Sequence, residues 1–208
     1  MRQNVPMSSL PATFTTVHTL KNSQRQRRER LLVAAWELAA EGGYAAVTMH
    51  AVADRSQVAR ATLYRYFGSK DQLLTAVGAE WTRQANAAVW RPEAVAAESA
   101  AGAAERVAAF LAEIVERTAH EMPLASAVVS AVISGDPTAD RERRVLYELV
   151  LGRLEETIGT AVTAEDRAEI VALLGQLVLG AVTGQCLLHQ SLEQVRDMLT
   201  GAAHRLLP

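Results

Sequence analysis

The side chains best suited to chemistry lie between positions 60 and 70, where basic and aromatic residues alternate and no acidic residue occurs. Arg60, Arg65 and Lys70 can neutralise phosphates, and an Arg can also bond two acceptor atoms of a guanine. Tyr64 and Tyr66 carry hydroxyl groups that can bond phosphate oxygens. The pattern therefore predicts contact with nucleic acid. An amphipathic surface without a partner is the alternative interpretation for the two tyrosines.

Two short helices, at 49–55 and 60–67, are expected to present these side chains. They are separated by about four residues, which matches the size of a helix-turn-helix. Thr48 is placed to cap the first helix, and Gly68 ends the second. The apolar residues of the two helices face each other, so the basic and aromatic face is left outside.

A longer helix is expected on each side of this motif. The upstream helix spans about 26–41, and Gly42–Gly43 ends it. The downstream helix opens at Ser69, with Gln72 at its third position in the pattern of a capping box. It continues to about residue 89.

The rest of the chain is also expected to be helical, because Ala and Leu are frequent and aromatic residues and Pro are scarce. Residues 1–22 lack periodicity and mix Pro, Ser, Thr and Asn, which predicts a disordered tail. The helices predicted beyond residue 90 are 103–120, 124–133, 138–158, 164–189 and 192–206, with Thr163 and Ser191 as caps. The fold class is therefore all-α, with a three-helix helix-turn-helix domain at 23–70 and a second helical domain at 71–208.

The residues of the motif identify a family. From Thr62 to Leu74 the sequence reads TLYRYFGSKDQLL, and Gly43-Tyr44, Val47-Thr48-Met49 and Val52-Ala53 precede it. Over about residues 28 to 76 the chain resembles the N-terminal domain of the TetR family of transcriptional regulators. Within that family it is especially similar to actinobacterial repressors of sterol and lipid catabolism.

The resemblance implies that the second short helix lies in the major groove of DNA. Residues at its start would face base edges, and its tyrosines would bond phosphates. Lys70 would add a cation to a helix N-terminus, where the dipole already favours anions. Arg27, before the first helix, is expected to neutralise a phosphate or reach a minor groove, with a solvated helix start as the alternative. The predicted DNA-binding residues are Arg27, Thr48, Arg60, Ala61, Thr62, Tyr64, Arg65, Tyr66 and Lys70.

Two residues of the turn depart from the family pattern. Gln57 stands where a Gly is usual, and it would be strained if this position needs a positive φ. Ala59 stands where a Ser or Thr usually caps the second helix, which forgoes about 1 kcal/mol. Both departures put the angle of the second helix, and hence the base contacts of Arg60, in question.

The resemblance also implies that 71–208 is a ligand-binding and dimerisation domain. Its apolar stripes are core residues by default, and part of them would line a cavity for a small molecule. An apolar effector, acyl-CoA or steroid-like, is favoured. The predicted ligand-binding residues are Trp81, Trp90, Phe110, Ile114, Leu124, Val128, Leu146, Tyr147, Val150 and Gln185.

The helix predicted at 164–189 carries a strip of small residues that permits close helix contact, and together with 192–206 it has the properties of a pairing surface. In the TetR family the last two helices of each subunit form a four-helix bundle across a two-fold axis. Such a homodimer would hold two recognition helices about 34–36 Å apart, one turn of DNA. Burial of both faces within one subunit is the competing account. The predicted interface residues are Gly175, Leu177, Gly180, Ala181, Gly184, Leu188, Val195 and Leu199.

Charge and cysteine content are compatible with a cytoplasmic DNA-binding protein. Residues 1–80 hold ten Lys and Arg against six Asp and Glu, whereas 81–208 hold eleven against seventeen. A basic N-terminal part favours contact with a polyanion, although chance patchiness would give the same difference. Cys186 is the single cysteine, so an internal disulfide is excluded. No signal peptide is recognised, and the apolar stretch 170–188 is expected to be a buried helix rather than a membrane span.

No motif favours catalysis. The sequence has no paired His and carboxylate at metal-binding spacing, no Gly-rich phosphate loop and no Ser nucleophile elbow. An enzyme is therefore not predicted, and neither a cofactor nor a metal is expected. The predicted function is a ligand-responsive regulator, a repressor, whose partners are a palindromic DNA operator, a small apolar effector and a second copy of the chain. The alternative is a helical scaffold protein, which would leave the face of 60–70 without a purpose.

Overall fold

The computed structural model describes residues 12–89 and 102–208, and in those ranges every regular element is a helix. The all-α prediction is therefore confirmed. The elements are α1 (Ala12–Ala46), α2 (Met49–Ser56), α3 (Arg60–Tyr66), α4 (Lys70–Val89), α6 (Ala103–His120), α7 (Met122–Ile133), the short 3₁₀ helix η1 (Pro137–Ala139), α8 (Asp140–Ile158), α9 (Ala164–Leu187) and α10 (Leu192–Leu206).

Helix α1 is longer than predicted at its N-terminal end. It begins at Ala12, so residues 12–22 are helical and not part of a disordered tail. The physical reason is that neither Pro nor Gly occurs between Pro11 and Gly42, so nothing interrupts the helix. Residues 1–11, the rest of that predicted tail, lie outside the described part. The predicted helix end is confirmed, because Gly42 and Gly43 leave helical geometry and Gly43 has φ +64°.

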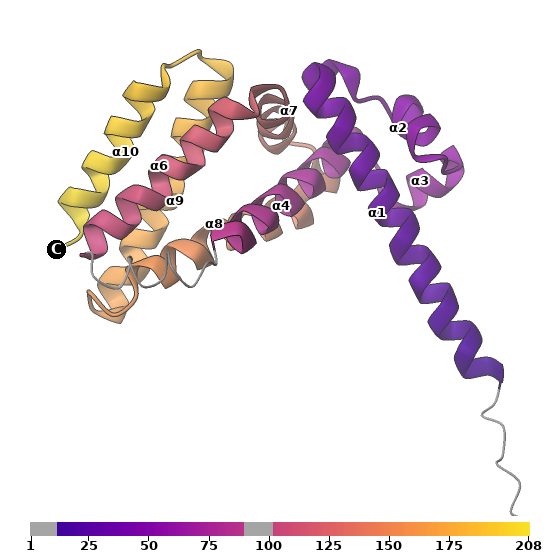
Figure 1. The fold of residues 1–208 in the computed structure, drawn as a ribbon, viewed down its shortest axis with the longest axis horizontal. Coiled ribbons are helices and arrows are strands. Elements are labelled where there is room, and N and C mark those ends of the chain that lie inside the picture. The colour runs from indigo at the N-terminus through magenta and orange to yellow at the C-terminus, as the bar shows by residue number, and fades with distance from the viewer. Residues whose placement is uncertain (1–11, 90–101) are drawn as a thin grey trace, which may run out of the picture.

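The first hydrophobic core joins α1, α2, α3 and α4 to α7. Leu31, Leu63 and Leu74 are fully buried in it, and Leu124 and Ala131 of α7 are buried in the same cluster. Figure 1 shows α2 and α3 on one side of the long α1, with α4 running back toward the rest of the molecule. This core does not end at residue 70, because α7 completes it.

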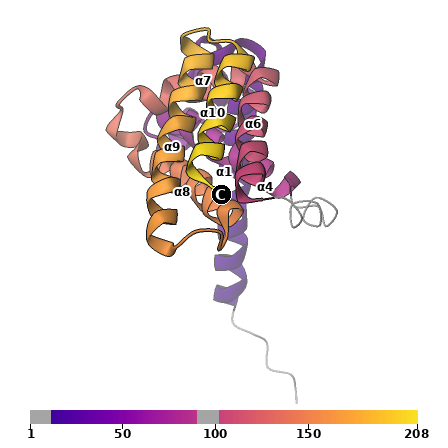
Figure 2. The same ribbon diagram turned by 90° about the vertical axis from the view of Figure 1, so that its left-hand side faces the viewer.

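The second core lies between α6, α8, α9 and α10. Leu111, Leu154, Leu174 and Leu199 are fully buried there. Figure 2 looks at this end of the molecule, where α6, α9 and α10 run side by side. The boundaries predicted for these helices agree with the structure to within about two residues, and the caps predicted at Thr163 and Ser191 are confirmed: their hydroxyl oxygens accept from Asp166 N (3.2 Å) and Gln194 N (3.2 Å).

Helix α9 is long and apolar enough to cross a membrane by length and composition alone. Half of its most apolar window is nevertheless buried inside the protein, against α6, α7, α8 and α10. Core helices pass the same test of length and composition. The packing of α9 agrees with the prediction of a buried helix.

Candidate nucleic-acid interface and cavity

The turn between α2 and α3 has the strain that the sequence indicated. Gln57 adopts the left-handed conformation, with φ 54° and ψ 36°, which is unfavourable for a residue with a Cβ. Ala59 precedes α3 without a side-chain cap, although the carbonyl of Ala59 still accepts from the amides of Thr62 and Leu63. At the start of α2, Thr48 acts as the predicted N-cap by accepting from Ala51 N at 3.0 Å. The helix-turn-helix therefore forms in spite of both departures from the family pattern.

The outward face of α3 is available to a ligand. Arg60, Ala61, Tyr64 and Arg65 are exposed, and the Tyr64 side chain is 49% exposed. Within the described residues, no hydrogen bond or ion pair engages Arg60 or Tyr64. Leu63 turns into the core, so it anchors this face from behind. An exposed phenol and guanidinium without internal partners are donors that phosphates and bases can accept from.

Tyr66 lies at the edge of this face rather than on it. Its hydroxyl donates to the carbonyl oxygen of Gln24 in α1 at 3.2 Å, and the side chain is half-buried. The Arg65 guanidinium stacks at 5.9 Å from the centre of the Tyr66 ring. Tyr66 therefore ties α3 to α1, and its predicted phosphate contact would have to replace or share the bond to Gln24.

Lys70 is held by Tyr44, which lies in the last turn of α1 after the kink at Gly42–Gly43. Its ammonium lies 3.5 Å from the centre of the Tyr44 ring and donates to the Tyr44 carbonyl oxygen. Partial burial lowers the pKa of Lys70. The Tyr44 hydroxyl donates to the Asp71 carboxylate at 2.7 Å, and this bond raises the pKa of Tyr44 to about 12. The cluster fixes the N-terminus of α4, so a phosphate would compete with the Tyr44 carbonyl for Lys70.

Arg27 and Thr62 are half-buried, and within the described residues no ion pair engages Arg27. The nine residues predicted to bind DNA thus lie on α1, α2, α3 and the first turn of α4. Their role in DNA binding stays a prediction.

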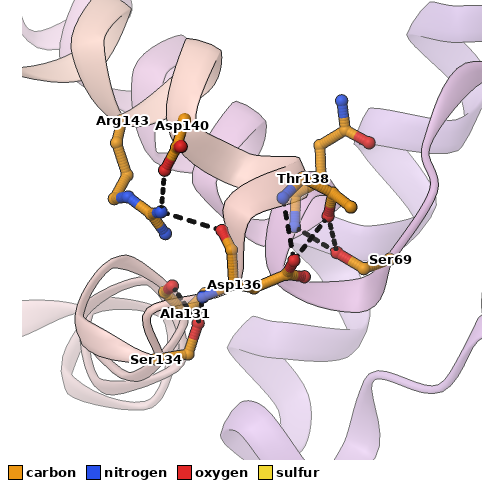
Figure 3. Close-up of polar contacts among 8 residues, drawn as sticks. Ser69, Ala131, Ser134, Asp136, Thr138, Asp140 and Arg143 are labelled. Atoms are coloured by element: carbon orange, nitrogen blue, oxygen red, sulfur yellow. Dashed lines mark hydrogen bonds and ion pairs between the residues drawn. The ribbon is translucent and has the colours of Figure 1, made fainter.

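A hydrogen-bonded junction joins the helix-turn-helix to the second half of the chain (Figure 3). The hydroxyls of Ser69 and Thr138 lie 2.8 Å apart, and the Asp136 carboxylate accepts from the amide (2.9 Å) and hydroxyl (2.8 Å) of Thr138. A hydrogen bond from the Ser69 hydroxyl to the Asp136 carboxylate, followed by the bonds from the Thr138 amide and hydroxyl, lowers the pKa of Asp136. Arg143 donates to the Asp136 carbonyl at 2.8 Å and to the Asp140 carboxylate. The predicted cap at Ser69 is present as well, accepting from Gln72 N at 3.0 Å.

A cavity of about 570 Å³ lies between α4, α7, α8 and α9, with Thr118 of α6 also on its wall. Its volume falls within the range of small-molecule sites. Gly78 gives α7 room to approach α4 here, because a Cβ at this position would lie 2.5 Å from Val128. Trp81 lines the wall and donates from its indole nitrogen to Glu121 at 3.1 Å.

Half of the residues predicted to bind a ligand lie on the wall of this cavity. They are Trp81, Val128, Leu146, Tyr147 and Val150. Phe110 and Ile114 line a smaller neighbouring cavity of about 80 Å³. Leu124 and Gln185 do not line either: Leu124 is buried in the first core, and Gln185 donates to the Val115 carbonyl at 3.2 Å. Trp90 lies outside the described residues.

The predicted dimer strip is only partly exposed. Ala181, Val195 and Leu199 are buried within the subunit, because α10 packs on α6 and α9. Gly175 faces Leu151 of α8, and Gly184 faces Gln190. For these five residues the competing account, burial within one subunit, describes the structure. Gly180 and Leu188 are exposed and Leu177 is half-buried.

Sequence reasoning missed Arg143 and Arg144, which lie on the cavity wall beside Leu146 and Tyr147. A signal was present in the sequence: two adjacent arginines begin the same stripe of α8 as the predicted lining residues. It also missed Asp136 and Thr138, because a bond between residues 69 positions apart leaves no local pattern.

These elements define a helix-turn-helix protein whose second half holds a cavity. The family model of bacterial regulatory proteins, tetR family, matches residues 31–77. The chain is 56% identical over 62 residues to the HTH-type transcriptional repressor KstR of Mycobacterium tuberculosis and 54% identical over 63 residues to that of Rhodococcus jostii. These matches span 29% and 30% of this chain, and 28% and 30% of the repressors' own length.

Solved structures extend the likeness to the whole fold. A TetR transcriptional regulator from a Rhodococcus species has a TM-score of 0.72 at 24% identity, covering 85% of this chain and 95% of that one. The Bacillus subtilis regulator FadR, in complex with stearoyl-CoA, has a TM-score of 0.52 at 18% identity, covering 86% and 97%. At these identities the likeness is one of fold. Residues 31–77 thus match the DNA-binding domain of the TetR family of transcriptional regulators, and the described chain has the fold of such regulators.

Proposed function

We propose that this protein is a cytoplasmic transcriptional repressor that binds a palindromic operator as a homodimer and leaves it when a small apolar effector fills the cavity. Residues 23–70 would read DNA, and 71–208 would bind the effector and form the dimer. Binding and release need no catalysis. An effector needs only different affinities for the two forms of the repressor.

The exposed face of α3 carries this proposal. Arg60 and Tyr64 project from a buried anchor without internal partners, within the domain where the KstR repressors are 54–56% identical. In this assignment Arg60, Ala61 and Thr62 meet base edges. Tyr64, Arg65, Thr48 and Arg27 meet the phosphate backbone and fix the register.

Lys70 and Tyr66 would join the interface at a cost. Each already bonds a carbonyl oxygen of the protein, Lys70 that of Tyr44 and Tyr66 that of Gln24. A DNA phosphate is an anion and so is a stronger acceptor for these donors than a neutral carbonyl. DNA binding would therefore loosen the contacts that tie α3 and α4 to α1.

A dimer is supported by the side of α9 that the subunit leaves uncovered. Leu173 (47% exposed), Gly180 and Leu188 (69% exposed) are apolar residues on α9 or at its end. A second copy that covers them would remove this apolar surface from water. The proposed interface is thus the outer side of α9, rather than the strip that α8 and α10 already cover.

An effector is supported by the position of the cavity. Gly78, Trp81 and Thr82 of α4 lie on its wall, and α4 begins at the junction with the helix-turn-helix. A ligand that displaces α4 would change the separation of the two recognition helices. The relative FadR is named in complex with stearoyl-CoA, which agrees with an apolar effector for this chain.

The proposal is tested by binding to the DNA upstream of the protein's own gene at two salt concentrations. We expect sequence-specific binding whose affinity falls steeply as salt rises. Arg60→Ala should relax specificity at one base pair, by about 1–3 kcal/mol, whereas Lys70→Gln should weaken binding to all sequences. Arg205→Ala, on the exposed end of α10, is the control and should change neither. Absence of binding at low ionic strength would overturn the proposal.

Sedimentation tests the dimer. The wild type should have twice the chain mass at micromolar concentration, and Leu173→Asp should have the mass of one chain because it places a charge on the proposed interface. A monomeric wild type would refute this part of the proposal.

A further inference from the structure

We propose that the cavity is built for a ligand with an apolar body and one anionic group, and that the anionic group lies against Arg143 and Arg144. This inference deepens the proposed function, because it names the chemical class of the effector. It concerns Arg143 and Arg144, which lie outside the family match at residues 31–77.

The charge of the cavity wall is one-sided. Among the described residues that line it, Arg143 and Arg144 are the charged ones, and no Asp or Glu belongs to the wall. Both arginines come from the first half of α8. An anion would gain from the Arg144 charge and from the part of the Arg143 charge that the ion pair with Asp140 leaves unbalanced, whereas a neutral ligand would gain from neither.

Arg143 has hydrogen-bonding capacity left. Its Nη2 donates to the Asp136 carbonyl and to the Asp140 carboxylate, but its buried Nη1 has no hydrogen-bond partner. A buried unmet donor costs about 1–3 kcal/mol. A small shift of the side chain would let a ligand oxygen satisfy this donor.

Arg144 is the second cation and is exposed. Within residues 12–89 and 102–208 its guanidinium forms no ion pair, so a ligand would not have to displace a carboxylate from it. An arginine fork also matches the planar geometry of a carboxylate or the oxygens of a phosphate.

Tyr147 adds a third donor on the same turn of α8. Its hydroxyl oxygen accepts from Gln176 Nε2 at 3.2 Å, which leaves the hydroxyl hydrogen free to donate. Residues 143, 144 and 147 are neighbours on one side of a helix. The donors are thus gathered in one part of the wall.

Apart from Thr82, Thr118 and Gln176, the rest of the wall is apolar. Val128, Val129 and Val132 of α7 face Val178 and Val182 of α9 across it. These residues would hold a hydrocarbon body, and their low polarity would strengthen the interaction of an anion with the arginines. The cavity therefore has an apolar part and a cationic part. These would match the apolar body and the anionic group of a fatty acid or an acidic steroid.

The competing account is that the arginine stems merely cover apolar surface while their charges stay in water. The two accounts differ in one measurable quantity. A covering role predicts equal affinity for an acid and an alcohol of the same chain length. An anion site predicts a preference for the acid.

The experiment compares decanoate with decan-1-ol as probes of the full-length protein without DNA. Binding is followed by tryptophan fluorescence, since Trp81 lies on the cavity wall. We expect decanoate to bind at least about tenfold more tightly, since a hydrogen bond to a charged group contributes about 1.5–3 kcal/mol and 1.4 kcal/mol is tenfold. Arg144→Gln should remove most of this preference and leave decan-1-ol binding unchanged.

Arg141→Gln is the matched control, because Arg141 is an exposed arginine of the same helix that does not line the cavity. It should leave the preference intact. Arg143→Gln is avoided as the first variant because Arg143 also holds Asp136 and Asp140. Tyr147→Phe is the second test and should lower decanoate affinity alone. Decyl phosphate and decanoyl-CoA, whose negative charges are on phosphate groups, serve in further arms to distinguish a phosphate from a free carboxylate.

Equal affinity for decanoate and decan-1-ol would overturn the inference, as would an equal loss of the preference in Arg144→Gln and Arg141→Gln. Because no DNA is present, the result is separate from the test of operator binding. An acid preference in a protein that ignores its own upstream DNA would refute the proposed repressor and leave the anion site standing.

Discussion

Removing the hydrogen bond between Ser69 and Thr138 tests how firmly the helix-turn-helix is joined to the second half of the protein. Ser69 opens α4 and Thr138 lies in η1, so the bond links two segments that are far apart in the chain. We predict that Ser69→Ala and Thr138→Val each lower the free energy of unfolding and that their effects are not additive.

The magnitudes follow from the bonds that each change removes. Ser69→Ala loses the cap on Gln72 N, about 1 kcal/mol, and the bond to Thr138, about 0.5–1 kcal/mol since Thr138 is exposed. Thr138→Val keeps the cap but loses the hydroxyl bonds to Ser69 and Asp136, about 1 kcal/mol together. The double variant loses the shared bond only once. The coupling should therefore be about 0.5–1 kcal/mol.

Urea unfolding of the four proteins in this cycle measures the coupling. The control cycle pairs Thr138→Val with Thr163→Ala, because Thr163 caps α9 by the same kind of bond and does not touch Thr138. That pair should be additive within about 0.5 kcal/mol. A second reading comes from NMR titration of the Asp136 carboxyl: Ser69→Ala should raise its pKa, since the Ser69 hydroxyl is the main cause that lowers it.

Additive effects in the Ser69–Thr138 cycle, together with an unchanged pKa of Asp136, would refute this account of the junction. Loss of the cap alone would explain the Ser69→Ala result in that case.

Two further predictions concern the helix-turn-helix domain. Gln57→Gly should raise the free energy of unfolding by about 0.5–1 kcal/mol, because relief of the left-handed strain outweighs the entropy that Gly adds to the unfolded chain. Thermal unfolding measures this gain, and the control Gln57→Ala should show none. A lower unfolding midpoint for Gln57→Gly than for the wild type would contradict the prediction. For Tyr44 the folded pKa of about 12 lies above the ordinary value of 10.0, so the stability from its bond to Asp71 is fully present below about pH 10 and is lost as the pH rises toward 12. The difference in unfolding midpoint between wild type and Tyr44→Phe should therefore vanish over that interval, whereas Tyr64→Phe, which removes an exposed phenol without an internal partner, should show no such trend.

Local signals in the sequence predicted the elements well. The start and end of α6 and α10, the caps at Thr48, Thr163 and Ser191, and the break at Gly42–Gly43 all follow from residues within a few positions. The strain at Gln57 was also predictable, because the turn needs a positive φ and the residue is not Gly. These features depend on neighbours in the chain, which a sequence displays directly.

Contacts between distant segments were harder to predict. The strip of small residues on α9 was assigned to a partner subunit, but within the subunit Gly175 already faces Leu151 and Tyr147 of α8. A small residue permits close packing without saying which helix approaches. Arg143 was overlooked for the same reason: its bonds run to Asp136 and Asp140, and only the folded chain brings it to a cavity wall.

The sharing of α7 between two environments has a consequence for how this protein can evolve. Leu124 and Ala131 face the core beneath the DNA-reading helices, whereas Val129 and Val132 face the cavity. Bulkier residues on the cavity side would press this twelve-residue helix against the first hydrophobic core, which supports α2 and α3. Selection for a new ligand is therefore freer to change residues of α8 and α9. Adaptation of this protein to another small molecule should produce substitutions in those two helices first.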